Sequence, residues 1–174
     1  LVGSEMCIRD RATAMNLLTE LSNYLKKHDL KICTAESCTG GMIASCLTEL
    51  PGSSEWFTMG FVTYTLEMKS KFLGLEKNFL HQEGPINAYT VEKMAQGALR
   101  ESGADIALST SGLAGPDSGG NPAPIGTVWF ACADKNGVVS KKEFFRGNRA
   151  DIRLYATQYS LYFCLQFLKA RYLN

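Results

Sequence analysis

The sequence Lys31-Ile-Cys-Thr-Ala-Glu-Ser-Cys-Thr-Gly-Gly41 places a short apolar run directly before hydroxyl-bearing residues and two glycines. The segment 42–47, Met-Ile-Ala-Ser-Cys-Leu, then resumes with helical spacing. Together they predict a strand, a tight turn and a helix, with Ser37 in the turn. Backbone N–H groups at a helix start lack internal partners, so such a turn can stabilise an anion or an oxyanion. An ordinary N-cap is the alternative, because Ser, Thr and Gly are common there.

Hydrophobic periodicity predicts the other helices and strands. Helices are expected over 12–27, 40–50, 66–73, 78–82, 89–102 and 148–168, and strands over 31–35, 57–65, 105–110, 127–133 and 138–145. Strands separated by helices and closed by a hairpin predict an α/β fold, a three-layer α/β/α sandwich around a mixed sheet. We expect a single domain over 12–170, with residues 1–11 as a disordered leader or a cloning remnant.

Composition limits the classes of function. The chain has 174 residues, of which 45% are hydrophobic and 20% charged, as in an ordinary globular domain. A net charge of +1 gives no electrostatic reason to expect a nucleic-acid partner or an anionic membrane surface. The six cysteines have irregular spacings without a CxxC pair, which favours reduced, buried thiols in a cytoplasmic protein.

Histidine is scarce, because His28 and His81 are the only two in the sequence. Both stand in polar contexts where a solvated side chain is expected. A histidine-based triad or a histidine-rich metal site therefore has few residues available. Any hydrolytic chemistry is expected to use lysine, tyrosine or carboxylates instead.

Three predicted strands end in segments with reactive or glycine-rich character, namely 37–41, 64–69 and 111–120. Ligands of α/β folds collect at the carboxyl ends of strands, so we expect these segments to meet. Ser37 would attack a carbonyl, and Lys69 would accept its proton if burial near other cations lowers the lysine pKa. Tyr64 would relay or orient that proton. The plain alternatives are a surface tyrosine and a solvated helix lysine.

Several other residues have two interpretations each. The loop 111–124, rich in Gly and Pro, has the composition of an anion-binding nest, with Ser111, Gly112 and Gly115 at its start. Arg146, Arg149 and Arg153 either bind a phosphate or form a charged face. Glu36 either orients Lys69 or a substrate amide, or accepts hydrogen bonds from the turn. A nucleophilic Cys38 is the weaker alternative to Ser37.

Five motifs in order along the chain resemble the CinA C-terminal domain family, with the match running from about Ala12 to Leu168. They are Thr34-Ala-Glu-Ser-Cys-Thr-Gly-Gly41, Pro51-Gly-Ser-Ser-Glu-Trp-Phe57, Gly60-Phe-Val-Thr-Tyr64 with Lys69, Ser111-Gly-Leu-Ala-Gly-Pro-Asp117, and Gly126-Thr-Val-Trp-Phe130. One departure is Ala123 in a loop where such proteins often carry a lysine, which removes a cation.

The resemblance implies hydrolysis of the carboxamide of nicotinamide mononucleotide to nicotinic acid mononucleotide and ammonia, without a metal or other cofactor. It also implies a catalytic group that falls on Ser37, Tyr64 and Lys69. We expect the substrate to contact Thr39, Gly40, Gly41, Ser111, Gly112, Gly115 and Arg149.

The alternative function is a non-catalytic nucleotide-binding module used in regulation or assembly. The expected partner is a small molecule rather than nucleic acid or membrane. A homo-oligomer is also considered, because Trp56, Phe57 and the aromatic stripe 155–167 suit either self-association or an ordinary core.

Overall fold

The computed structural model describes residues 11–173, so the predicted leader lies outside the described residues except for Arg11. The elements are, in chain order, α2 (Arg11–Lys27), β1 (Ile32–Glu36), α3 (Met42–Leu47), the 3₁₀ turn η1 (Ser53–Glu55), β2 (Phe57–Val62), α4 (Leu66–Leu73), α5 (Lys77–Glu83), α6 (Ala88–Ser102), β3 (Ile106–Gly112), β4 (Thr127–Asp134), β5 (Gly137–Phe144) and α7 (Arg149–Arg171).

The five strands form one sheet in the order β2-β1-β3-β4-β5. Strand β1 pairs in parallel with both β2 and β3, whereas β3–β4 and β4–β5 are antiparallel. The sheet is therefore mixed, as predicted. Because β1, β2 and β3 run in the same direction, the segments that follow them leave the sheet at the same edge.

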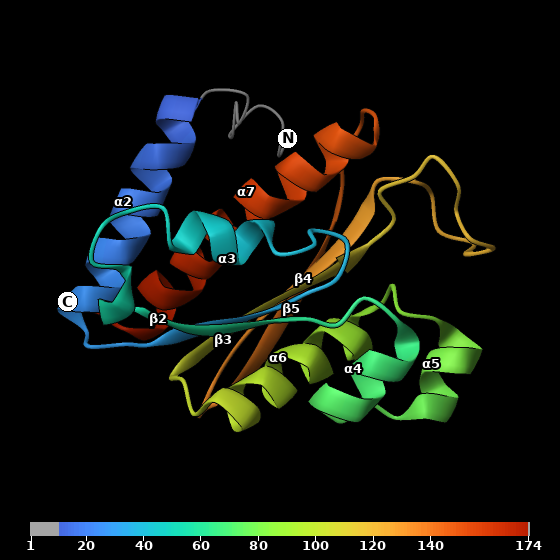
Figure 1. The fold of residues 1–174 in the computed structure, drawn as a ribbon, viewed down its shortest axis with the longest axis horizontal. Coiled ribbons are helices and arrows are strands. Elements are labelled where there is room, and N and C mark those ends of the chain that lie inside the picture. Colours follow the sequence, from blue (N-terminus) through green and yellow to red (C-terminus); the bar gives the residue numbers. More distant parts are fainter. Residues whose placement is uncertain (1–10, 174) are drawn as a thin grey trace.

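Helices cover both faces of the sheet, which confirms the predicted α/β/α sandwich (Figure 1). Helices α2, α3 and α7 lie on one face, and α4, α5 and α6 on the other. Buried apolar side chains fill both layers, for example Ile32 and Leu108 beneath α2 and α7, and Ala35 and Ala107 beneath α6. Among residues 11–173, no helix combines the length and the apolar character that a membrane crossing needs.

Three predicted boundaries near the candidate site are wrong, and turn geometry explains two of them. Gly40 and Gly41 have positive φ values of 59° and 102°, so they belong to the turn and α3 begins only at Met42. Strand β2 ends at Val62 rather than 65, because the Thr65 side chain accepts a hydrogen bond from the Met68 N–H and caps α4. Strand β3 continues through 112, so the glycine-rich loop starts later than expected.

Helix capping and the cysteine side chains complete the local structure. Asn87 and Asn148 cap α6 and α7 through their side chains, and Asn148 forms a capping box with Asp151. The five described cysteines are free thiols, and Cys7 lies outside the described residues. Trp56 is 1% exposed and packs in the core, whereas self-association and the domain limits at 12 and 170 stay predictions.

Helix α4, which carries Lys69, lies unusually close to α6 at Gly97. A Cβ atom on Gly97 would lie 2.2 Å from the Leu73 carbonyl oxygen, far inside contact distance. The absence of a side chain at this position therefore lets the end of α4 pack directly against the α6 backbone. Because Leu73 and Lys69 lie on the same helix, this contact also holds the Lys69 side chain in its buried position.

We expect Gly97→Ala to lower the free energy of unfolding by about 2 kcal/mol, because α4 must move away from α6. Helix propensity alone would change stability in the other direction, by about 1 kcal/mol in favour of alanine. Urea unfolding measures which effect dominates. Lys93→Ala, on the exposed side of the same helix, is the matched control, and a Gly97→Ala protein more stable than wild type would contradict the packing argument.

Candidate active site

Ser37 follows the last residue of β1 and is held between the two neighbouring strands. Its own N–H donates to the Thr110 carbonyl of β3 at 3.1 Å. The carbonyl of the preceding Glu36 accepts from the Thr63 N–H, beyond the end of β2, also at 3.1 Å. These bonds extend the parallel pairing past the strand ends. As a result, the turn that carries Ser37 has a fixed position at the edge of the sheet.

Lys69 reaches Ser37 from the first turns of α4. Its side chain is 1% exposed, and Nζ lies 2.9 Å from Ser37 Oγ. Nζ also donates to the carbonyl oxygens of Thr63 at 2.7 Å and Tyr64 at 3.0 Å. The expected meeting of the hydroxyl and the amine is therefore confirmed, and the alternative of a solvated helix lysine is wrong.

Burial changes the acidity of this amine. Removal of the ammonium from water lowers the pKa of Lys69 from 10.5 to about 8. Desolvation causes this lowered pKa, whereas the neighbouring cations that we expected from the sequence do not contribute to it. Near neutral pH a useful fraction of Lys69 is the free amine, which is the form that can accept a proton from a serine hydroxyl.

Glu36 occupies the start of α3. Its carboxylate accepts hydrogen bonds from the N–H groups of Gly41, Ile43 and Ala44 at 2.9–3.2 Å, and from the Thr39 hydroxyl at 2.7 Å. Of the two interpretations from the sequence, the turn-binding carboxylate is thus confirmed. The α3 N–H groups are already in use, so they do not form the anion site that the sequence suggested.

Two other backbone N–H groups of the turn are not bound by the Glu36 carboxylate. The Gly40 N–H donates to the Ser37 carbonyl at 3.0 Å, but within residues 11–173 neither the Cys38 nor the Thr39 N–H donates to a protein acceptor. From α7, Arg153 Nε binds the Cys38 carbonyl at 3.0 Å, and Nη2 approaches the Thr39 carbonyl at 3.5 Å. Arg153 therefore binds the peptide that carries the Thr39 N–H and the one after it, whereas the Gly40 N–H binds the peptide that carries the Cys38 N–H.

Tyr64 lies at the site, but its phenol does not join the amine. The side chain is 57% exposed, and its hydroxyl accepts a hydrogen bond from Arg149 Nη2 at 3.2 Å. Lys69 bonds to the backbone carbonyl of Tyr64 instead. The structure thus places the phenol at the solvent side of the site, beside a guanidinium.

Arg149 also binds the glycine-rich loop. Its Nη1 donates to the Gly115 carbonyl at 2.8 Å, so one side chain connects this loop to the β2–α4 turn. Ser111 donates its hydroxyl to the Pro85 carbonyl at 2.8 Å, and the Gly112 position in β3 packs against β4. Of the predicted loop contacts, Arg149 and Gly115 are brought together, whereas the Ser111 hydroxyl is engaged elsewhere.

The arrangement argues against Cys38 as a nucleophile. Its side chain is 5% exposed, and Sγ lies 4.0 Å from Thr110 Oγ1. Burial raises the pKa of the Cys38 thiol from 9.0 to about 11, so the reactive thiolate is scarce at neutral pH. His28 packs beside Tyr24, and His81 is exposed on α5, so neither supplies a base to this thiol.

The carbonyl groups of Thr63 and Tyr64 are the part of the site that sequence reasoning missed. They belong to the irregular segment between β2 and the Thr65 cap of α4, which the sequence pattern predicted to be part of a strand over 57–65. Among residues 11–173, no three His, Cys, Asp or Glu side chains gather as a metal site.

Comparison with known proteins agrees with this fold. The family model for the CinA C-terminal domain matches residues 14–168. The Escherichia coli (strain K12) protein named nicotinamide-nucleotide amidohydrolase PncC is 44% identical over 148 residues, which is 84% of this chain and 90% of that protein. The protein of the same name from Enterobacter agglomerans is 44% identical over 155 residues, covering 88% and 94%.

Solved structures of CinA superfamily proteins have the same fold. A competence-damaged protein (CinA) superfamily protein from Escherichia coli superimposes with a TM-score of 0.87 at 33% identity, covering 91% of this chain and 92% of that one. A CinA superfamily protein from Klebsiella pneumoniae 700603 has a TM-score of 0.87 at 29% identity, covering 90% and 98%.

The lowered pKa of Lys69 has a measurable effect on stability. Below pH 8 both the folded and the unfolded states hold the Lys69 proton, and burial of the ammonium disfavours folding. Between pH 8 and 10.5 the unfolded state binds more protons, so stability due to this residue rises with pH. Relative to Lys69→Met, the wild-type free energy of unfolding should therefore increase by about 2.5 kcal/mol from roughly pH 7 to pH 10.

Chemical denaturation at each pH provides this measurement, and other titrating groups cancel because both proteins share them. Lys71→Met, an exposed lysine on the same helix, is the matched control. If the difference in free energy of unfolding between wild type and Lys69→Met stays constant over this pH range, the folded protein does not release the Lys69 proton at a lowered pKa.

Proposed function

This chain belongs to the CinA C-terminal domain family, and from that membership and the Ser37–Lys69 contact we propose that it is a serine amidohydrolase. The substrate that we propose is nicotinamide mononucleotide, because two relatives that match 88% and 84% of the chain are named nicotinamide-nucleotide amidohydrolases. The observation that carries the proposal is a buried amine 2.9 Å from a buried serine hydroxyl. This pair supplies a nucleophile and a base without histidine.

The contacts of Lys69 suit the role of general base. A neutral amine has two N–H groups and one lone pair. If the N–H groups point to the carbonyls of Thr63 and Tyr64, the lone pair faces Ser37 Oγ, which then donates its proton to Nζ. The two backbone acceptors also stabilise the ammonium that forms after the transfer.

The reaction proceeds in two halves. As Ser37 Oγ bonds to the carboxamide carbon, its proton moves to Lys69, and the tetrahedral oxyanion lies at the Cys38 and Thr39 N–H groups. The ammonium then gives that proton to the amide nitrogen, the C–N bond breaks, and ammonia leaves an acyl ester on Ser37. Water attacks this ester with Lys69 again as base, which releases the carboxylic acid and restores the serine.

The remaining predicted residues would bind the nucleotide. Arg149 is exposed at the solvent side of the site and binds the Gly115 carbonyl, and a cation at this position suits a ribose phosphate. Tyr64, next to Arg149, would contact the substrate and assist departure of ammonia rather than exchange protons with Lys69 directly. Gly40 and Gly41 shape the turn, and Thr39 contributes its N–H, because its hydroxyl already binds Glu36. A cytoplasmic location remains a prediction from the cysteine usage.

The test is ammonia release from nicotinamide mononucleotide by purified protein. We expect Ser37→Ala and Lys69→Met each to lower kcat by at least about 10³-fold. Ser37 forms the bond to the substrate carbon in the proposed reaction, and Lys69 transfers the proton. Tyr64→Phe should lower kcat/KM by roughly 10-fold to 100-fold, because the phenol acts through substrate contacts.

Lys71→Met is the control, since it removes an exposed lysine from the same helix. Mass spectrometry should detect the acylated Ser37 peptide after an acid quench. Near wild-type ammonia release in Ser37→Ala or Lys69→Met would remove that residue from the mechanism. Tight nucleotide binding without ammonia release by the wild-type chain would favour the alternative of a non-catalytic nucleotide-binding module.

A further inference from the structure

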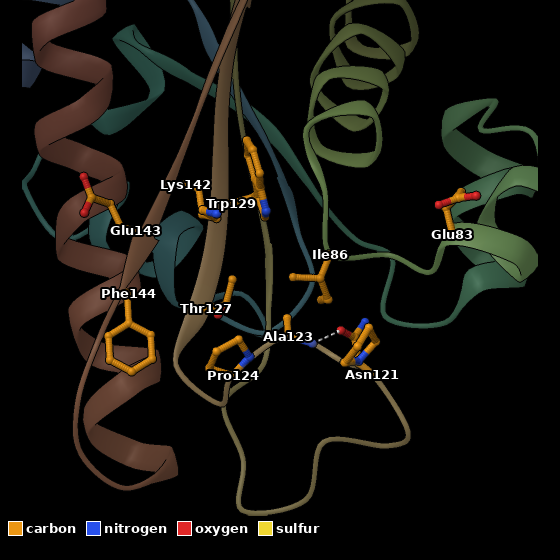
Figure 2. A pocket seen from close by; sticks show the side chains of 11 residues that line it. Glu83, Ile86, Asn121, Ala123, Pro124, Thr127, Trp129, Lys142, Glu143 and Phe144 are labelled. Carbon is orange, nitrogen blue, oxygen red and sulfur yellow. Dashed lines mark hydrogen bonds between the residues drawn. The ribbon is translucent and has the colours of Figure 1, made fainter.

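A cavity of about 860 Å³ lies at the β4–β5 end of the sheet, and neither Ser37 nor Lys69 lines it (Figure 2). Its walls come from the start of β4, the end of β5, the chain before α6 and the end of the glycine-rich loop. The size is in the range of cavities that bind small organic molecules. The lining residues that the argument uses are Ile86, Pro124, Trp129, Lys142 and Phe144.

Trp129 and Lys142 form the polar and aromatic centre of the cavity. They are direct cross-strand partners on β4 and β5, so their side chains share the face of the sheet that carries α6. Lys142 Nζ lies 5.9 Å from the centre of the Trp129 ring, near the outer limit of a cation–π contact. The ammonium therefore remains free to turn toward an anion.

The charge of Lys142 is not neutralised within the described chain. No carboxylate of residues 11–173 forms an ion pair with it. Glu143 points toward α7, where it pairs with Lys141 at 3.1 Å and accepts a bond from Tyr159. Glu83 stands on the opposite wall (Figure 2). On the same face of β5, Glu92 accepts a hydrogen bond from Ser140 at 2.6 Å and forms no ion pair with Lys142. An anionic group at the Lys142 end would thus meet a cation that no carboxylate of residues 11–173 pairs with.

The other walls are apolar. Phe144 is 50% exposed on the same face of the sheet as Lys142, and Ile86 and Pro124 also line the cavity. A large exposed aromatic side chain beside a half-buried tryptophan favours a flat apolar ligand. We propose that this cavity is a second binding site, separate from the Ser37–Lys69 site, for a small planar aromatic carboxylate that packs on Trp129 and pairs with Lys142.

The site also has a route to influence the candidate active site. A neighbouring cavity of about 370 Å³ shares Glu83, Ile86, Asn121 and Pro122 with it and extends to Leu66 and Leu113. Leu66 begins α4, the helix that carries Lys69. The binding inference does not depend on the proposed reaction.

The test uses the intact chain labelled with 5-fluorotryptophan and observed by ¹⁹F NMR. The protein has only two tryptophans, and Trp56 is buried with its indole N–H bound to the Leu47 carbonyl, so Trp56 is an internal reference. The probes are quinoline-2-carboxylate and its uncharged carboxamide. We expect the carboxylate to shift the Trp129 signal saturably while the Trp56 signal stays in place.

Lys142→Gln should weaken carboxylate binding about 3-fold to 5-fold, and Lys142→Arg should retain it, because an exposed ion pair contributes an effect of that size. Lys141→Gln, the adjacent lysine on the opposite face, is the matched control and should leave affinity within about two-fold. Arg149→Gln should also leave it unchanged, because that residue belongs to the other site.

Three results would overturn the inference. The first is a Trp129 signal that does not move up to about 10 mM probe, which corresponds to no useful affinity. The second is a carboxamide that binds as tightly as the carboxylate, and the third is an equal effect of Lys142→Gln and Lys141→Gln. Each of these outcomes would show that Trp129 and Lys142 do not form an anion-specific aromatic site.

Discussion

The contact between the Lys69 amine and the Ser37 hydroxyl is the interaction on which the rest of this structure depends. A buried lysine is unfavourable for folding while it is charged, so the surrounding fold must hold it in place. Three features do so: the parallel order of β2, β1 and β3, the cap at Thr65, and the close packing of α4 on α6 at Gly97. The fold thus maintains an amine whose pKa lies near the working pH of a base.

The acidic and basic groups around this contact have separate tasks. Glu36 is fully buried and binds the N–H groups at the start of α3, which keeps the turn rigid. Because those donors are occupied, the proposed stabilisation of an oxyanion falls to the Cys38 and Thr39 N–H groups. From α7, Arg153 binds the carbonyl of the peptide that carries the Thr39 N–H. Arg149 connects the glycine-rich loop to Tyr64 at the entrance. Helix α7 therefore supports both the turn and the loop.

Sequence patterns predicted the layers, the mixed sheet and the meeting of Ser37 with Lys69, because apolar periodicity and the common edge of parallel strands determine these features. The same patterns did not predict the backbone carbonyls that bind Lys69, since backbone direction after β2 depends on the Thr65 cap. They also left the role of Glu36 open, because a carboxylate in a turn can face either the amine or the helix start. The cavity at Trp129 and Lys142 depends on how a long loop folds back, which local sequence does not determine.

The most direct test of the account is a titration of Lys69 itself. The chain labelled with ¹³C at the lysine ε-carbon gives one signal for each lysine, and the Lys69 signal is identified as the one that Lys69→Met lacks. We expect this signal to titrate with a pKa of about 8. A midpoint at the ordinary value of 10.5 would contradict the account, because Lys69 would then be almost entirely protonated at neutral pH.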